Sequence, residues 1–216
     1  MNILCSWSGG KDSCFALMKA MDHGYTPKVL LNVLNEEGKI SRSHGIPYNI
    51  LEAQSEAAGI PIHLIQSSWK DYEQNFTNAL HYLKATYTLD AAVFGDIDLQ
   101  PHRDWEEMVC RNAGLKAILP LWQQNREQLV MQMLRSGIRT MIVSCNEKMG
   151  EAFLGKIIDE ALVEELKAID VDVCGENGEF HTLVIDCPLF KYPVNVEVSA
   201  KTKHDNYWFA QPVLCS

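Results

Sequence analysis

Residues 2–13 read NILCSWSGGKDS, an apolar run that leads into two glycines, a lysine and an aspartate. The apolar part is typical of a buried strand, and the glycines that follow it predict a loop. Residues 12–23 then place apolar side chains at helical spacing, and Gly24 predicts the end of that helix. A strand, a loop and a helix in this order indicate the beginning of a layered α/β unit.

The same alternation of apolar strands and helices continues along the chain. Further strands are predicted at residues 28–34, 61–66, 91–95, 116–119 and 139–145, and helices at residues 47–58, 70–86, 103–113 and 125–136. The strands are apolar along nearly their whole length, as expected when helices cover both faces of a sheet. The predicted fold class is therefore α/β, with a doubly wound parallel sheet.

The pattern changes after residue 145. The remainder contains a helical pattern at 146–168, a glycine-rich stretch at 173–179, and two strand-like runs at 194–202 and 207–213 that flank His204, Asp205 and Asn206. Such a polar triplet between two strand-like runs favours a hairpin. We therefore expect a nucleotide-binding domain at residues 1–145 and a smaller α+β subdomain, which would bind the substrate, at residues 146–216.

Charge and cysteine usage narrow the class of protein. The 216-residue chain carries 19 Lys and Arg residues against 28 Asp and Glu residues, a formal net charge of −9. Such a surface repels nucleic-acid backbones, so broad binding of DNA or RNA is not expected, whereas a local pocket for one nucleotide is compatible with it. Neither a signal peptide nor a membrane-spanning run is recognisable. The seven scattered cysteines are typical of reduced thiols, and we expect a cytoplasmic protein.

The loop after the first predicted strand has the chemistry of a phosphate site. It consists of Ser8, Gly9, Gly10, Lys11, Asp12 and Ser13. In an open parallel sheet this edge is where ligands bind. Glycines let backbone N–H groups close on an anion, the helix directs its positive dipole end there, and the lysine adds a full charge. The alternative is a plain turn before a helix that is N-capped by Asp12 or Ser13.

The spacing of this loop differs from a Walker A loop, which needs a glycine at Cys5 and Ser or Thr at Asp12. Residues 8–13 instead resemble, at every position, the SGGKDS pyrophosphate loop of the N-type ATP pyrophosphatases, part of the adenine nucleotide α-hydrolase-like superfamily. The resemblance implies that ATP is split between its α and β phosphates. A substrate oxygen is adenylated, pyrophosphate leaves, and a nucleophile then displaces AMP.

Later segments of the chain indicate which family of this superfamily the chain resembles. They are Val93 to Ile97, Arg103 to Gly114, Pro120 to Trp122, and the run CGENGEFHTL at residues 174–183. Together with the first loop they resemble the diphthine–ammonia ligase family over most of the chain. In that family, ATP and ammonia convert the diphthine carboxylate on elongation factor 2 into an amide. The resemblance implies the same reaction here.

Two departures from the family's pattern concern the loops. Asn177 replaces the middle glycine of the family's Gly-Glu-Gly-Gly-Glu motif, and asparagine tolerates the left-handed backbone region that such a loop uses. Residues 96–105 also differ from the segment usual in archaeal and eukaryotic members. For a bacterial source, where diphthamide is not expected, the acceptor acid is left open.

The resemblance and the residue chemistry together indicate candidate catalytic and metal-binding residues. Lys11 is expected to stabilise charge on the phosphates. Asp12 and Asp96 are candidates for Mg²⁺, a hard cation that takes carboxylate oxygens. Glu176 and Glu179, three residues apart in the glycine-rich stretch, can position ammonia or hold ammonium before it loses a proton.

Further candidates for nucleotide binding are His44, Gly95 and Arg103, beside Ser8, Gly9, Gly10, Lys11, Asp12 and Ser13. A plain structural interpretation stays open for several candidates. It is a surface loop for His44, a solvated turn for Glu176 and Glu179, and a surface ion pair with Asp104, Glu106 or Glu107 for Arg103. Cys174 fits a small buried residue better than a nucleophile.

Three hypotheses about function follow. The leading one is an ATP-dependent amide ligase that uses ATP, Mg²⁺ and ammonia, with elongation factor 2 or a small acid as acceptor; a homodimer is left open. The second is a tRNA-modifying sulfurtransferase of the same superfamily, which the scattered cysteines and acidic charge disfavour. The third is a non-catalytic ATP-binding module, against which Asp96, Glu176 and Glu179 argue.

Overall fold

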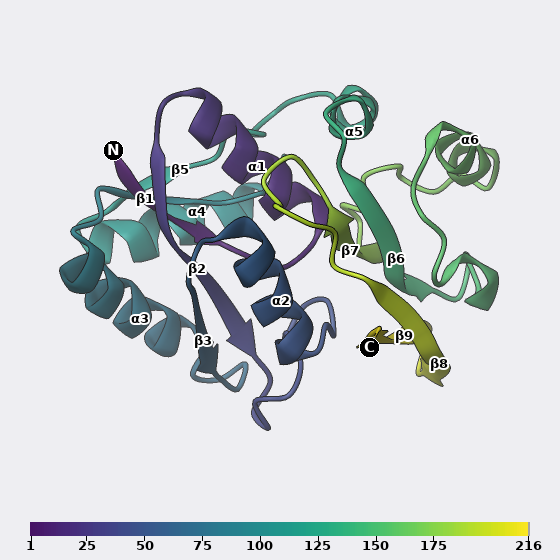
Figure 1. Ribbon diagram of the computed structural model, residues 1–216, viewed down its shortest axis with the longest axis horizontal. Coiled ribbons are helices and arrows are strands. Elements are labelled where there is room, and N and C mark those ends of the chain that lie inside the picture. The colour runs from purple at the N-terminus through teal and green to yellow at the C-terminus, as the bar shows by residue number, and fades with distance from the viewer. Residues whose placement is uncertain (216) are drawn as a thin grey trace.

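The computed structural model describes residues 1–215 and contains a five-stranded sheet of order β3-β2-β1-β4-β5 (Figure 1). Its strands are β1 Asn2–Ser6, β2 Thr26–Leu34, β3 Ile62–Gln66, β4 Ala91–Val93 and β5 Lys116–Ile118. Helices α1 Lys11–Asp22, α2 Tyr48–Ala58, α3 Tyr72–Tyr87 and α4 Gln100–Asn112 connect them. All neighbouring strands are parallel, so the predicted doubly wound α/β class is confirmed.

Alternating side chains of β1 pack into two separate cores, because successive residues of a strand point to opposite faces of the sheet. Ile3 and Cys5 belong to the core that contains residues of α1 and α2, and Leu4 belongs to the core that contains residues of α3 and α4. Figure 1 shows α1 and α2 between the parallel sheet and the C-terminal part. The first core continues there through Ile142 and Leu183, so the two parts of the molecule share one hydrophobic core.

The C-terminal part is built on an antiparallel sheet of order β7-β6-β9-β8. Its elements are α5 Arg126–Arg135, β6 Arg139–Asn146, the short 3₁₀ helix η1 Glu151–Phe153, α6 Glu160–Ala168, β7 Phe180–Asp186, β8 Val196–His204 and β9 Tyr207–Leu214. Strands β8 and β9 form the predicted hairpin, and Asp205 in its turn has a φ of 50°. The expected smaller α+β part is therefore present.

The strand predicted at residues 139–145 exists as β6, but it lies in the antiparallel sheet. It pairs with a strand on each side and its middle residues are buried, which explains its continuous apolar sequence. An apolar run does not reveal the direction of its neighbours, so the expectation of a further parallel strand is wrong. The division of the chain at residue 145 stays a prediction, and the second sheet already begins at Arg139.

The single helical segment expected at residues 146–168 is also wrong. Gly150 and Gly155 have φ of 80° and 86°, and the chain between β6 and α6 forms turns and the short η1. Helix α6 begins only after Asp159, whose side chain accepts a hydrogen bond from Leu162 N at 2.8 Å. The two glycines and this N-cap outweigh the apolar spacing of the segment.

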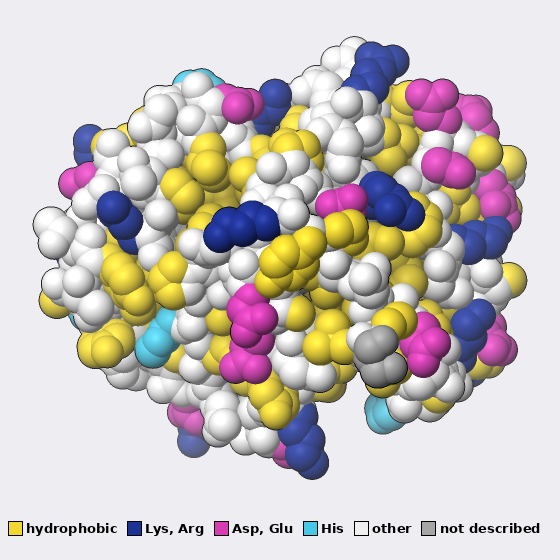
Figure 2. Space-filling view, in the orientation of Figure 1, with side chains coloured by type: hydrophobic (Ala, Val, Ile, Leu, Met, Phe, Trp, Pro, Cys, Tyr) yellow, Lys and Arg dark blue, Asp and Glu magenta, His cyan; other side chains and the backbone are white. Residues whose placement is uncertain are grey.

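Charged side chains of both signs lie on the surface. On the face drawn in Figure 2, basic side chains are scattered among acidic ones and do not gather into one patch of the described residues. A strong electrostatic footprint for a nucleic-acid backbone would need such a patch. In residues 1–215, every helix is too short or too polar to cross a membrane.

Candidate active site

A cavity of about 670 Å³ lies at the carboxyl ends of β1 and β4, where the order of the parallel strands reverses. Doubly wound sheets bind ligands at this switch point, and the volume is in the range of small-molecule sites. The predicted residues that line it are Ser8, Lys11, Asp12, Ser13, His44, Gly95, Asp96 and Glu176. Gly9, Gly10, Arg103 and Glu179 do not contribute to the lining that the described residues form.

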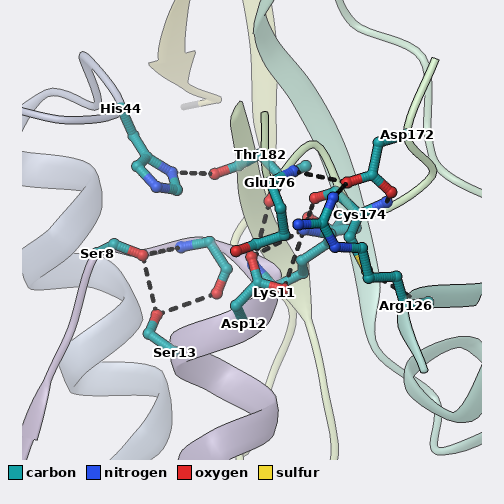
Figure 3. A network of polar contacts seen from close by, with 12 residues as sticks. Ser8, Lys11, Asp12, Ser13, His44, Arg126, Asp172, Cys174, Glu176 and Thr182 are labelled. Carbon is teal, nitrogen blue, oxygen red and sulfur yellow. Dashed lines mark hydrogen bonds and ion pairs between the residues drawn. The ribbon is translucent and has the colours of Figure 1, made fainter. Parts of the chain in front are cut away.

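Residues 8–13 form a closed loop whose polar groups bond to one another (Figure 3). Ser8 Oγ accepts a hydrogen bond from Gly10 N at 3.2 Å and lies 3.1 Å from Ser13 Oγ. Gly9 has a φ of 84°, a backbone region that favours glycine. The predicted loop is therefore present at the predicted edge of the sheet.

Helix α1 begins within this segment, at Lys11. Gly10 is its N-cap and no side chain caps it, so the alternative in which Asp12 or Ser13 is the N-cap is wrong. The first N–H groups of a helix have no acceptors within the helix. They and the positive dipole end of α1 favour an anion at this edge of the cavity.

The C-terminal part of the molecule holds the loop in place. Thr182 Oγ1 accepts a hydrogen bond from Lys11 N at 3.1 Å, and Val184 N donates to Gly9 O at 2.9 Å. Gln54 Nε2 in α2 donates to the same Gly9 O at 3.0 Å and to Val184 O at 2.7 Å. Sequence reasoning missed Gln54 and Val184, because no local pattern shows which distant strand contacts the loop.

The Lys11 side chain is only 3% exposed and lies between the two parts of the molecule. Its Nζ donates to Asp12 Oδ2 at 2.8 Å and to the Cys174 carbonyl oxygen at 2.5 Å. Burial acts to lower the pKa of Lys11, but the charge and hydrogen bond of Asp12, together with the neighbouring Cys174 and Glu176, outweigh it and raise that pKa above its ordinary value. Lys11 therefore provides a buried ammonium group beside Asp12 in the lining of the cavity.

His44 lines the cavity from the loop between β2 and α2. Its Nδ1 lies 2.8 Å from Thr182 O, and its ring lies against the ring of His181 at 4.6 Å between centroids. Burial lowers the pKa of His44 to about 4 and that of His181 to about 3. Both rings are neutral at pH 7, so His44 Nδ1–H donates to Thr182 O and supplies no full charge to a phosphate. His181 precedes Thr182 in the run at residues 174–183, and the sequence analysis did not select it as a candidate.

Asp96 follows β4 and belongs to a chain of titratable groups. His102 Nδ1 lies 2.7 Å from Asp96 Oδ1, and the Glu106 carboxyl lies within hydrogen-bonding range of Asp96. Burial, and then the hydrogen bond to Asp96 and its charge, raise the pKa of Glu106 to about 11. Burial acts to raise the pKa of Asp96, but hydrogen bonds from His102 and Glu106 outweigh it and lower that pKa. Asp96 is therefore ionised and Glu106 protonated at pH 7.

The two glutamates of the glycine-rich loop are in different positions. Glu176 lines the cavity on the side of Lys11 and Asp12 (Figure 3), and burial followed by the charge of Asp12 raises its pKa to about 7. Glu179 instead accepts hydrogen bonds from Asn177 N at 3.0 Å and from Asp172 N at 3.4 Å. Glu179 therefore holds the shape of the loop that carries Glu176.

Two other predicted residues make close contacts within the protein. Arg103 Nε donates to Glu107 at 2.7 Å and its guanidinium stacks over Trp122, so it forms the ion pair of the alternative interpretation. Gly95 lines the cavity, but a Cβ there would come within 2.7 Å of the backbone of Asp12 and Ser13. Its lack of a side chain lets β4 and α1 approach each other.

Arg126 at the start of α5 connects the two parts of the molecule beside the cavity (Figure 3). It forms two hydrogen bonds of 2.7 Å to Asp98 in the N-terminal part and one of 2.5 Å to Asp172 in the C-terminal part. Cys174 Sγ donates to Arg126 O at 3.1 Å, and burial raises the pKa of this thiol to about 12. Cys174 is therefore a protonated, buried thiol, in agreement with the structural interpretation.

The parallel sheet, its switch point and the SGGKDS loop that borders the cavity agree with the class that the sequence resembles, the N-type ATP pyrophosphatases. The family model described as diphthamide synthase N-terminal domain matches residues 1–117, and the model of the C-terminal domain matches residues 125–215. The chain therefore belongs to the diphthamide synthase family.

Two curated proteins that are similar to the chain are both named diphthine–ammonia ligase. The chain is 28% identical to the diphthine–ammonia ligase of Homo sapiens over 97% of its own length and 88% of that protein. It is 31% identical to the diphthine–ammonia ligase of Schizosaccharomyces pombe over 88% of its length and 35% of that longer protein. A solved structure of a predicted tRNA methyltransferase subunit from Methanocaldococcus jannaschii aligns with a TM-score of 0.48 at 15% identity, over 87% of this chain and 98% of that one. That likeness is too low to carry an argument.

Proposed function

We propose that the protein is an ATP-dependent amide ligase that joins ammonia to the carboxylate of diphthine on elongation factor 2, or to another acid in a source without diphthine. The observation that carries this proposal is the buried Lys11 ammonium at the SGGKDS loop, at the base of a cavity that also contains Asp12, Asp96 and Glu176. Family membership supports the same reaction.

The proposed reaction has two steps. A carboxylate oxygen of the acceptor attacks the α-phosphorus of ATP, and the bond to the β-phosphate oxygen breaks to release pyrophosphate. Ammonia then attacks the acyl carbon, AMP leaves, and the attacking nitrogen loses a proton. Lys11, the loop hydroxyls and the start of α1 would stabilise the negative charge that grows on the departing pyrophosphate.

The donor set of the cavity fits Mg²⁺. Its lining carries four carboxyl groups, of Asp12, Asp96, Glu106 and Glu176, and Lys11 as its one Lys or Arg, so a triphosphate needs further positive charge there. Within residues 1–215, no three His, Cys, Asp or Glu side chains converge on one metal position. Mg²⁺ usually binds through one or two carboxylates plus substrate phosphates, and Asp12 and Asp96 would supply these carboxylates. Bound Mg²⁺ would neutralise phosphate oxygens during displacement.

Glu176 is the proposed acceptor of the proton that the attacking ammonia loses. Its pKa of about 7 lets it be ionised or protonated near neutral pH, as a general base requires. Glu179 would act through Glu176 by holding the loop.

The test uses the full chain with Mg²⁺, ATP, ammonium and purified elongation factor 2 that carries diphthine, followed by chromatography of the nucleotides and mass spectrometry of the factor. We expect AMP and pyrophosphate in equal amounts, and a change of −1 Da in the factor as the acid becomes an amide. Release of ADP and phosphate would contradict the proposal. AMP formation without the mass change would retain ATP pyrophosphatase chemistry but reject this acceptor.

The buried, protonated Cys174 provides no observation in favour of a sulfurtransferase, because thiolate chemistry requires a lowered thiol pKa. A module that only binds ATP would likewise not need the acidic side chains around Lys11.

A further inference from the structure

The peptide bond between Gly9 and Gly10 is held in one orientation from the side of α2 and β7. The Gly9 carbonyl oxygen accepts two hydrogen bonds, from Val184 N at 2.9 Å and from Gln54 Nε2 at 3.0 Å. In a planar trans peptide the N–H group points in the direction opposite to the carbonyl. The Gly10 N–H is therefore directed to the other side, where Ser8 Oγ accepts from it at 3.2 Å.

The orientation of this peptide controls the electrostatics of the loop. Both of its residues are glycines, so no Cβ opposes a turn of the peptide plane. After such a turn, the carbonyl oxygen would point toward Ser8, whose side chain borders the cavity together with that of Ser13. Backbone N–H groups attract an anion, whereas a carbonyl oxygen in the same place repels it. A turned peptide would therefore weaken the binding of a phosphate.

The Gln54 side chain that prevents this turn is itself oriented by a further residue. Gln54 is fully buried, and its Nε2 donates to Gly9 O and to Val184 O at 2.7 Å. Its Oε1 accepts a hydrogen bond from Trp7 Nε1 at 2.9 Å. An indole N–H can only donate, so Trp7 keeps the amide oxygen of Gln54 on its side and leaves the NH₂ group to face Gly9 O.

From these contacts we propose that Gln54 is a positioning residue of the phosphate site. With its amide oriented by Trp7, it holds the Gly9–Gly10 peptide so that the N–H, and not the carbonyl, faces the pyrophosphate part of ATP. The inference rests on the proposed function, since it takes pyrophosphate as the anion that the loop binds. Because Val184 belongs to the same network, the orientation of the loop also depends on β7 in the C-terminal part.

Nuclear magnetic resonance can observe this one peptide. Gly9 and Gly10 are the only adjacent pair among the 13 glycines. In a chain labelled with carbonyl ¹³C and amide ¹⁵N in glycine, a carbonyl-selected spectrum therefore contains one signal, that of the Gly10 N–H. When Mg²⁺ and inorganic pyrophosphate are added to the full chain, we expect this proton to move downfield, because charged acceptors form the shorter and stronger hydrogen bonds. Calorimetry measures the affinity for pyrophosphate under the same conditions.

Two variants remove the proposed control of the peptide. Gln54→Met retains the length of the side chain but no donor, so it should weaken pyrophosphate binding about tenfold and abolish most of the downfield movement of the Gly10 signal. Trp7→Phe retains a ring in the core but no N–H, which leaves the Gln54 amide free to turn, and it should weaken binding about threefold. Thermal unfolding shows whether each variant is folded; if Gln54→Met is not, Trp7→Phe provides the same test.

Ser55→Ala is the matched control. Ser55 is buried beside Gln54 in α2, and its Oγ donates to Ile60 O at 2.6 Å, a contact that does not involve the loop. This substitution should lower the unfolding temperature but leave the affinity for pyrophosphate and the Gly10 signal unchanged.

Wild-type affinity and a wild-type Gly10 signal in folded Gln54→Met, or in Trp7→Phe where only that variant folds, would overturn the proposal. An equal loss of affinity in Ser55→Ala would also overturn it, because Gln54 would then act only through the general stability of α2. Absence of pyrophosphate binding by the unaltered chain would instead contradict the proposed function, and the inference with it. The two kinds of failure are therefore distinguishable.

Discussion

The ammonium group of Lys11 already has hydrogen-bond partners within the protein. Its ammonium group is buried between the loop, Asp12 and the Cys174 carbonyl, which means that the charge is in place before a nucleotide enters. Preorganised charge of this kind stabilises a transition state without reorganisation at the moment of reaction.

Lys11→Ala should therefore lower the rate of AMP formation by about 10²–10³-fold, the usual effect of removing one preorganised donor. Asp12 remains partly exposed and can be hydrated, so the fold should persist. Steady-state AMP release and thermal unfolding measure the two effects, with Lys19→Ala on the same helix as the control. A Lys11→Ala protein that forms AMP at the normal rate would refute the assigned role.

The pKa of Glu176 leads to a prediction about the pH dependence of amide formation. Since burial and Asp12 raise its pKa to about 7, it is mainly protonated below that pH and ionised above it. If the ionised form accepts the proton from ammonia, amide formation should rise as the pH passes through 7. The rate must be compared at constant free NH₃, because ammonia itself titrates. Glu176→Gln should lose this rise while still binding ATP; identical pH profiles of the two proteins would contradict the role.

At this scale, the loop of residues 8–13 was predictable, and His44, Asp96 and Glu176 also line the cavity as expected, but the contacts that depend on helix packing were not predictable. Ser8 to Ser13 are adjacent in the chain, and their chemistry is visible in the sequence alone. The contacts of Gln54, Tyr72 and Glu106 depend on how α2, α3 and α4 pack, which no local pattern encodes. Likewise, the sequence could not distinguish Glu176, which faces the cavity, from Glu179, which supports the loop.

At the scale of elements, the approach of β4 to α1 forms one side of the site. A Cβ on Gly95 would lie 2.7 Å from backbone atoms of Asp12 and Ser13, and backbone cannot move aside as a flexible side chain can.

Gly95→Ala should thus destabilise the protein by about 1–3 kcal/mol, the usual cost of overpacking, and should lower AMP formation as well. Urea denaturation measures the change in the free energy of unfolding. Gly24→Ala is the matched control, because a Cβ at Gly24 has no neighbour within 4 Å and only its φ of 79° opposes the substitution. A Gly95→Ala protein of normal stability would show that the close approach can relax.

Strands and helices of the parallel unit were predictable because their hydrophobic periods are regular and glycines mark their ends. Strand β6 was identified as a strand but assigned to the wrong sheet, since a strand that is buried on both faces has the same apolar sequence in either kind of sheet. The helix expected over residues 146–168 was too long because Gly150 and Gly155 interrupt it.

At the scale of the whole molecule, the cavity depends on how the N-terminal and C-terminal parts are held together, because residues of both parts line it. Arg126 joins Asp98 to Asp172 across them, and the loop from Asp172 to Glu179 carries Glu176.

Arg126→Met should reduce the free energy of unfolding by about 1 kcal/mol, a modest value because Asp98 is partly exposed and can be hydrated. Equilibrium unfolding in urea measures this loss. Lys156→Met, which breaks the exposed pair with Glu165, should change stability by less than about 0.5 kcal/mol. Equal effects of the two substitutions would show that Arg126 does not hold the parts together.

The central claim is that the cavity cleaves ATP between its α and β phosphates. Turnover of two ATP analogues by the full chain, with Mg²⁺, ammonium and the diphthine-bearing factor, tests it most directly. β,γ-Methylene-ATP keeps the α–β linkage and should be converted to AMP and methylenediphosphonate. α,β-Methylene-ATP lacks that linkage and should bind without turnover. Conversion of the α,β-methylene analogue, with release of phosphate, would contradict the account.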